Sequence, residues 1–145
     1  MIKRICAVLI VFMGLLSMWG CSKSSQELVD GYYTAEMKDY ENGWKEFVTI
    51  CVSGGKIVDV EYNARNASGY IKSWDMAYMR RMNSKVGMYP NAYTRLYASQ
   101  LLELQNAEDI DAVTGATHSG ENFRKMAGVL LEKAKTGDTS LAIVE

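Results

Sequence analysis

The sequence predicts an α+β fold, in which an antiparallel meander of three or more strands carries helices on one face and follows a signal or anchor helix. Strand-forming stretches come first in the chain and helix-forming stretches come after them, without the strand–helix alternation of parallel α/β folds. The chain has 145 residues, of which 48% are hydrophobic and 1 is proline. This size and composition are typical of a single compact domain.

The first twenty residues have the composition of an export signal. Lys3 and Arg4 precede an apolar stretch, over about residues 5–19, that ends just before Cys21. The stretch has roughly 15 apolar residues, which is shorter than the ~20 that a helix needs to cross a bilayer. We therefore expect a lipoprotein signal peptide over 1–20, with Cys21 as the lipid-bearing N-terminus and the domain at the outer face of the membrane. The alternative is a signal anchor that is not cleaved.

A polar, serine-rich segment follows the signal. Its composition is typical of a flexible linker, and we expect it to form a tether over residues 21–29. The folded domain is then expected over 30–137, with a C-terminal tail over 138–145.

Cysteine content and net charge restrict the classes of function. Of the 3 cysteines, Cys6 lies in the signal and Cys21 takes the lipid, so Cys51 has no partner for an intramolecular disulfide. We expect Cys51 to be a small buried hydrophobe. Loss of two basic residues with the signal lowers the Lys and Arg count from 16 to 14 against 17 acidic residues, a net charge near −3. This charge indicates no nucleic-acid partner, and no His or Cys cluster indicates a metal site.

Three stretches are rich in strand-forming residues. Residues 31–37 form the first, residues 44–52 alternate between two faces, and residues 57–62 form the third. An Asn-Gly pair at 42–43 and a Gly-Gly pair at 54–55 mark the turns between them. Consecutive strands joined by such short turns predict the antiparallel meander.

Helical patterns occupy most of the remaining chain. We expect a short helix over 74–83, a second over 91–105 after a break at Gly87 and Pro90, and a third over 119–135. The apolar spacing gives the last two helices one buried face each. The expected faces are Tyr93, Leu96, Tyr97, Leu101, Leu102 and Leu104 in the second helix, and Phe123, Met126, Ala127, Leu130 and Ala134 in the third.

A run of small and hydroxyl-bearing residues precedes the last helix. It reads Asp111-Ala112-Val113-Thr114-Gly115-Ala116-Thr117-His118-Ser119-Gly120. Hydroxyl groups and the free N–H groups of a helix N-terminus bind anions, and Gly115 can take backbone angles closed to other residues. The run therefore predicts a phosphate site, with Thr117 about where the phosphate should lie. The alternative is a polar loop that ends in a capped helix.

The same run resembles the flavinylation motif of the FMN-binding domain family, Asp-x-x-Ser/Thr-Gly-Ala-Thr, whose last Thr can carry FMN through a phosphoester bond. A Gly-Trp-Lys-x-Phe hairpin that recurs in this family matches residues 43–47. The family includes flavinylated subunits of ion-pumping NADH:quinone and ferredoxin-linked reductases, and small lipoproteins of extracellular electron transfer. The size and the tether of this chain resemble the last group most. The resemblance implies an FMN cofactor esterified to Thr117.

The resemblance also implies partners and residue roles. A threonine hydroxyl is too weak a nucleophile at neutral pH to take FMN unaided, so we expect an external, magnesium-dependent FMN transferase with FAD as donor. Three residues match those that this enzyme is expected to recognise: Asp111, Gly115 and Ala116. Thr114 and Ser119 add hydroxyls, Ser119 is expected to cap the helix, and His118 is expected to hydrogen-bond the phosphate or the flavin.

We expect an electron carrier rather than an independent enzyme, with a membrane electron donor and an extracellular acceptor. The chain carries no nicotinamide motif and no iron–sulfur cysteines. Lys72 and Ser73 match a recurrent family position, and they either approach the flavin or belong to a solvated loop. The aromatic residue that stacks on the flavin is left open among Tyr32, Tyr33, Tyr62, Tyr70, Trp74, Tyr78, Tyr93 and Tyr97. The alternatives are a non-redox lipoprotein that binds a phosphate-bearing ligand, and a flavin-dependent reductase of a soluble acceptor.

Overall fold

The computed structural model describes residues 27–145. The expected signal peptide and the lipidation residue Cys21 lie outside the described residues. Within the described range, no helix combines the length and the hydropathy that crossing a bilayer requires.

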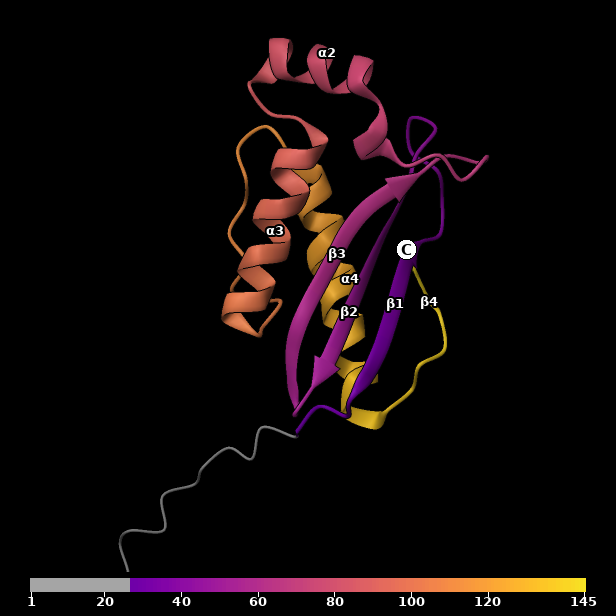
Figure 1. Cartoon of the computed structure of the whole chain (residues 1–145), viewed down its shortest axis with the longest axis vertical. Helices are drawn as coiled ribbons and strands as arrows, with labels where there is room; N and C mark the ends of the chain where they lie inside the picture. Colours follow the sequence, from indigo (N-terminus) through magenta and orange to yellow (C-terminus); the bar gives the residue numbers. More distant parts are fainter. Residues whose placement is uncertain (1–26) are drawn as a thin grey trace, which may run out of the picture.

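A four-stranded mixed sheet forms one layer of the domain, and helices pack on one of its faces (Figure 1). The first three strands are β1 (Gly31–Met37), β2 (Lys45–Ser53) and β3 (Lys56–Arg65), and they pair antiparallel in chain order. This confirms the predicted α+β class and its meander. A fourth strand, β4 (Ala142–Val144), pairs parallel with β1, so the order is β3-β2-β1-β4. It lies in the segment expected as a tail.

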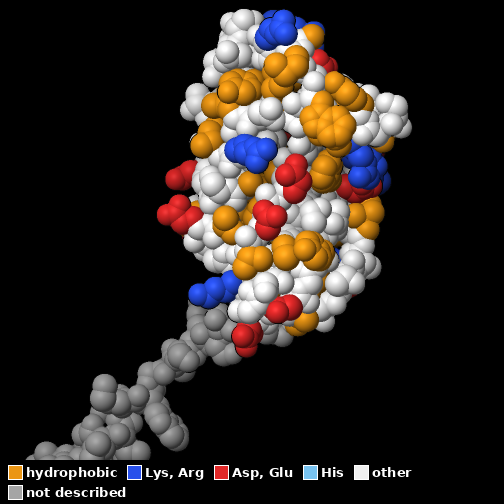
Figure 2. Space-filling view, viewed as in Figure 1, with side chains coloured by type: hydrophobic (Ala, Val, Ile, Leu, Met, Phe, Trp, Pro, Cys, Tyr) orange, Lys and Arg blue, Asp and Glu red, His pale blue; other side chains and the backbone are white. Residues whose placement is uncertain are grey.

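Alternation along β2 separates a buried face from an open one. Val48, Ile50 and Val52 are buried beneath the helices, as expected of a half-covered strand. Cys51 points to the other face, opposite Tyr32 of β1, and is half-buried. Our expectation of a buried Cys51 was therefore wrong, because the residue falls on the face that the helices leave open. Figure 2 shows hydrophobic side chains scattered between acidic and basic ones on the visible side of the molecule.

Three α-helices and one 3-10 turn follow the meander. They are η1 (Lys72–Trp74), α2 (Met76–Val86), α3 (Pro90–Leu104) and α4 (Thr117–Thr136). The predicted break between the first two helices is confirmed, because Gly87 is the C-cap of α2 and Pro90 begins α3. At the first position of a helix the missing N–H of proline costs nothing. Of the residues of α2, Met79 is buried and the others are half-buried or exposed, and this helix lies at one end of the domain (Figure 1).

The core lies between the sheet and the apolar stripe of α4. All five predicted residues of this stripe are fully buried: Phe123, Met126, Ala127, Leu130 and Ala134. The ring of Phe123 packs against Tyr62 of β3 and Tyr97 of α3, with centroids 4.7 and 5.6 Å apart. The prediction for α3 holds only in part. Tyr93, Tyr97 and Leu101 are buried, whereas its other three predicted core leucines are exposed: Leu96, Leu102 and Leu104.

The two ends of α4 lie at opposite ends of the domain. A helix of 20 residues is about 30 Å long. At its C-terminal end, the N–H of Val29 donates to the carbonyl of Ala134 at 2.8 Å, so the start of the described chain is held there. The N-terminal end of α4, with the predicted motif, lies at the far end of the molecule (Figure 1).

Close approach of α3 to α4 depends on Gly120. A Cβ atom at Gly120 would lie 2.1 Å from the hydroxyl oxygen of Tyr97. Tyr97 is fully buried, so its rigid ring has no space into which to move. Gly128, two turns further along α4, has no atom within 4 Å of the corresponding position.

These two glycines give a matched test of the packing. We expect Gly120→Ala to destabilise the domain by about 1–3 kcal/mol, because the added methyl group overpacks the site. Gly128→Ala should instead stabilise it by about 0.5–1 kcal/mol, since alanine favours the helix. Urea unfolding of both variants measures the two changes, and equal effects would contradict the packing described here.

Candidate functional site

Three segments that are distant in sequence form a cleft at the N-terminal end of α4. They are the turn between β1 and β2, the η1–α2 region, and the predicted motif. The cleft has a volume of about 200 Å³. It is lined by Glu41, Asn42, Trp44, Glu46, Lys72, Tyr78, Met82, Tyr93, Gly115, Ala116, Thr117, His118 and Ser119.

The motif forms a tight turn that leads directly into the helix. The N–H of Ala116 donates to the carbonyl of Val113 at 3.0 Å. Gly115 adopts φ +83°, and a Cβ atom there would lie 3.0 Å from the Cβ of Met88. Both the backbone angle and the space therefore favour glycine at this position.

The buried Tyr97 of α3 holds this turn through two hydrogen bonds. Its hydroxyl accepts a hydrogen bond from the N–H of Val113 at 2.8 Å and donates one to the carbonyl of Ala116 at 3.2 Å. Because Tyr97 is part of the buried core, the turn is tied to the packing of α3 against α4. The start of α4 is therefore fixed by the core rather than by surface contacts.

Helix α4 begins at Thr117, two residues earlier than expected. The N-cap residue is Ala116, no side chain caps the helix, and its first turn holds no acidic residue. An uncapped N-terminus leaves backbone N–H groups free. This end of α4 is thus suited to an anion.

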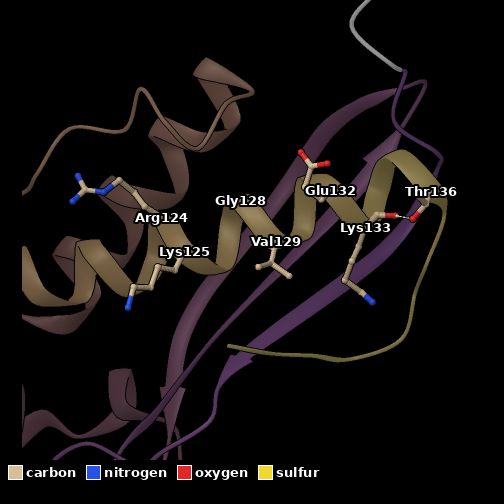
Figure 3. A pocket seen from close by; sticks show the side chains of 7 residues that line it. All are labelled: Arg124, Lys125, Gly128, Val129, Glu132, Lys133 and Thr136. Atoms are coloured by element: carbon tan, nitrogen blue, oxygen red, sulfur yellow. Dashed lines mark hydrogen bonds between the residues drawn. The ribbon is translucent and has the colours of Figure 1, made fainter. Parts of the chain in front are cut away.

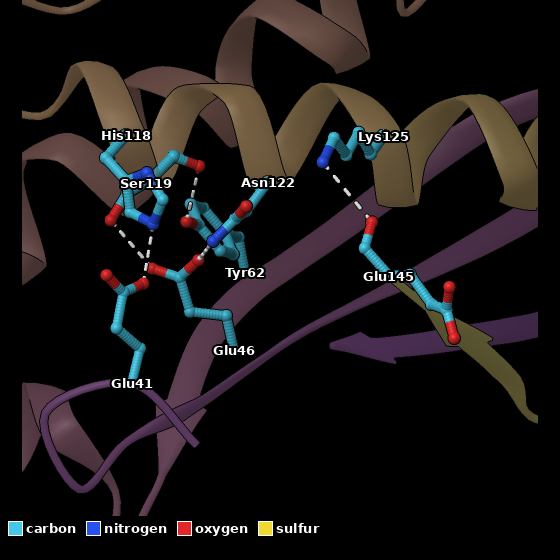
Figure 4. A network of polar contacts seen from close by, with 8 residues as sticks. All are labelled: Glu41, Glu46, Tyr62, His118, Ser119, Asn122, Lys125 and Glu145. Atoms are coloured by element: carbon cyan, nitrogen blue, oxygen red, sulfur yellow. Dashed lines mark hydrogen bonds and ion pairs between the residues drawn. The ribbon is translucent and has the colours of Figure 1, made fainter. Parts of the chain in front are cut away.

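Ser119 does not cap the helix, and that expectation was wrong. It lies inside the first turn, where its hydroxyl donates to Oε1 of Glu46 at 2.7 Å. The other carboxylate oxygen of Glu46 accepts from the amide of Asn122 at 2.9 Å. Figure 4 shows the side chains of β2 and α4 converging on this buried carboxylate.

Tyr62 completes the same network from β3. Its hydroxyl donates to the carbonyl of Ser119 at 2.8 Å. Burial raises the pKa of Tyr62 well above its ordinary value, so the hydroxyl stays protonated and remains a donor. Strands β2 and β3 thereby both hold the first turn of α4 in place.

The structure brings together only part of the predicted motif in the cleft. Gly115, Ala116, Thr117, His118 and Ser119 line it, whereas Thr114 and Asp111 do not. The side chains of Thr114, Thr117 and Asp111 are exposed. The backbone N–H of Asp111 donates to the side chain of Gln100 on α3 at 2.7 Å, which leaves its carboxylate at the surface.

His118 is engaged at the surface. Its Nε2 lies 2.5 Å from Oε2 of Glu41, and both side chains are more than half exposed, at 63% and 58%. Among residues 27–145, no side chain hydrogen-bonds to the hydroxyl of Thr117. The described part of the chain therefore directs no base at that hydroxyl.

Aromatic and basic residues line the cleft together with the motif. The rings of Trp44 and Tyr78 lie 6.2 Å apart, and the ammonium of Lys72 lies over the ring of Tyr78 at 5.3 Å. From the sequence, Lys72 was expected either near the flavin or in a solvated loop, and Tyr78 was one of several aromatic candidates for stacking on the flavin. Met82 was not indicated as a site residue. No periodic signal links these residues to the motif, because 30 residues, 87–116, separate the end of α2 from the start of α4.

Three hollows are larger than the cleft. One of about 360 Å³ shares Glu41, Trp44, Glu46 and His118 with the cleft, and the other two do not have the character of a site. One has a volume of about 520 Å³ along the outer side of α4, and Figure 3 shows its side chains diverging from the helix instead of converging on a point. The other, about 970 Å³, lies beside the start of the described chain and the turn between β2 and β3. In the described residues no group of three or more His, Cys, Asp or Glu side chains could hold a metal ion.

The cleft combines features suited to a phosphate-bearing aromatic ligand. The uncapped end of α4 with Thr117 lines it, and so do an aromatic pair and one ammonium group. Binding sites of this class place a few polar groups among apolar and aromatic walls.

Comparison with known proteins gives the family of the chain. No family model matches the sequence. A relative from Treponema pallidum (strain Nichols), the 15 kDa lipoprotein, is 40% identical over 124 residues, which cover 85% of this chain and 86% of the relative. A crystal structure of a Clostridium perfringens protein superimposes with a TM-score of 0.77 and 36% identity, over 81% of this chain and 97% of that chain. The chain belongs to the family of the Treponema pallidum 15 kDa lipoprotein.

Proposed function

We propose that this protein is an exported, lipid-anchored electron carrier that holds one FMN, esterified to Thr117, at the outer face of the membrane. An external FMN transferase attaches the cofactor. The carrier then relays electrons from a membrane donor to an extracellular acceptor.

The observation that carries this proposal is the position of Thr117. It is the first residue of α4 and is exposed, it follows the Gly115 turn, and no side chain caps the helix at this point. A phosphate joined to its hydroxyl would lie at the positive end of the helix dipole, beside free N–H groups. The ester and the helix would then hold the same phosphate.

The walls of the cleft fit the aromatic part of FMN. Trp44 and Tyr78 supply aromatic faces, and Met82 adds a flexible apolar side chain. At about 200 Å³ the cleft is smaller than the roughly 300–1,000 Å³ of pockets that enclose a ligand. A flavin ring held here would remain partly exposed, which suits exchange of electrons with a partner.

The surroundings of Thr117 favour a hydroxyl that accepts FMN from another enzyme over one that attacks the FMN donor unaided. Its hydroxyl is exposed, and the nearby imidazole of His118 is paired with Glu41. A weak nucleophile needs an adjacent base, which the transferase would supply. With FAD as donor, the pyrophosphate bond breaks, AMP leaves, and the FMN phosphate forms the ester with Oγ1 of Thr117.

The anchor and the site would lie at opposite ends of the domain. The Treponema pallidum relative is named a lipoprotein, which supports lipid attachment at Cys21. The described chain begins near the C-terminal end of α4, through the contact of Val29 with Ala134. Because α4 is about 30 Å long, the cleft would face away from the membrane and toward its partners.

Replacement of the acceptor hydroxyl tests the proposal. Wild-type protein expressed with an FMN transferase should keep yellow colour after denaturation and gain the mass of one FMN. Thr117→Ala should abolish both, because no oxygen remains to form the ester. Intact-mass spectrometry under denaturing conditions measures the gain.

Thr136→Ala is the matched control, since Thr136 is an exposed threonine at the other end of the same helix. It should gain FMN as the wild type does. Covalent flavin retained by Thr117→Ala would show that the site is wrong. Wild-type protein that binds no flavin with or without the transferase would favour a non-redox lipoprotein with a phosphate-bearing ligand, and turnover of a soluble acceptor by the isolated domain would favour a reductase.

The anchor is tested separately from the cofactor. We expect Cys21→Ser to move the protein from the membrane fraction to the soluble fraction of the host, because the thiol that takes the lipid is lost. Cys51→Ser, on the open face of the sheet, should leave it with the membranes. Fractionation with immunoblotting distinguishes the two, and a Cys21→Ser protein that stays with the membranes would indicate an uncleaved signal anchor.

A further inference from the structure

Lys72 is a cation held inside the cleft without a paired carboxylate. It belongs to η1, is half-buried and lines the same cleft as Thr117. Its ammonium lies over the ring of Tyr78 at 5.3 Å. The ion pairs found among residues 27–145 do not include it.

Two carboxylates, Glu46 and Glu41, act on Lys72 through their charge. Both form hydrogen bonds or ion pairs with other side chains. Glu46 accepts hydrogen bonds from Ser119 and Asn122, and Glu41 pairs with His118. Burial lowers the pKa of Lys72 from its ordinary value, although Glu46 and Glu41 oppose this shift. A partly desolvated ammonium of this kind gains stability when an anion occupies the space beside it.

The position of Lys72 points to the ring of a bound flavin rather than to its phosphate. A phosphate at Thr117 would lie at an exposed residue, where the free N–H groups at the start of α4 would bind it. Lys72 is instead packed against Tyr78, which in turn contacts Trp44. A planar ring that enters the cleft would meet the ammonium group at this aromatic wall.

We propose that Lys72 sets the reduction potential of the flavin, by placing its ammonium against the ring where negative charge appears on reduction. This inference rests on the proposed function. Uptake of two electrons and one proton converts the neutral oxidised ring to a reduced ring with one negative charge. A fixed positive charge beside the ring stabilises the reduced form more than the oxidised form, which raises the potential.

The midpoint potential of flavinylated variants tests this role. The potential is measured by titration with dithionite against a reference dye. We expect Lys72→Met to reduce the preference of the protein for reduced over oxidised flavin at least tenfold, a fall of about 30 mV for a two-electron couple. Lys72→Arg keeps the charge and should stay close to the wild type. Lys85→Met is the matched control, because Lys85 is exposed on α2 and does not line the cleft.

A second measurement separates the ring from the phosphate. The apoprotein is titrated with oxidised FMN and with riboflavin, which lacks the phosphate, and binding is followed by tryptophan fluorescence. If Lys72 acts on the ring, Lys72→Met should change both affinities by the same factor. A loss confined to FMN, with an unchanged potential, would place Lys72 at the phosphate and overturn the proposal.

The outcomes also separate this inference from the proposed function. Lys72→Gln is a second variant that removes the charge but keeps a polar side chain. If flavinylated Lys72→Met and Lys72→Gln both have the wild-type potential, the role of Lys72 is overturned and the flavin site is left intact. Wild-type protein that takes up no flavin would overturn both. Circular dichroism and thermal unfolding of the two variants establish that they are folded, so a changed potential reports on charge.

Discussion

The candidate site depends on how the N-terminus of α4 is held. The buried hydroxyl of Tyr97 bonds to both sides of the turn that precedes the helix, and Gly120 leaves the space for that ring. Glu46 then binds the first turn of α4 from the sheet. Because these contacts belong to the core, the backbone at Thr117 is held in place although the residue is exposed. A transferase would meet a preformed acceptor, and the ester would need little rearrangement.

The parts of the fold that follow a local periodicity could be predicted from the sequence. The alternation in β2 identified its two faces but not which of them is buried, because Cys51 was expected in the core. The three- and four-residue spacing in α4 identified all five residues of its stripe. Local rules failed where a long-range contact decided the outcome. Strand β4 has three residues and exists because β1 offers a free edge. Ser119 has the composition of a cap, but Glu46 from a distant strand takes its hydroxyl.

The motif residues of the candidate site were predicted from the sequence, and most of the other residues that line the cleft were not. The motif is a continuous run, so five of its residues could be placed together from their order alone. Other residues of the cleft come from η1 and α2. Of these, Tyr78 could be noted only as one of several aromatic candidates, and Met82 carries no signal that relates it to the motif. Lys72 could be noted but not assigned, since its burial beside an aromatic ring is a property of the folded chain. The charge that we infer to tune the cofactor is therefore visible only in three dimensions.

The covalent flavin at Thr117 is the central claim, and peptide mapping of the protein purified from its own host tests it most directly. Trypsin should release the segment from Leu96 to Arg124, because no lysine or other arginine lies within it. We predict that this peptide carries the mass of one FMN and that fragmentation places it on Thr117 rather than Thr114. An unmodified peptide, or a flavin on another residue, would contradict the account.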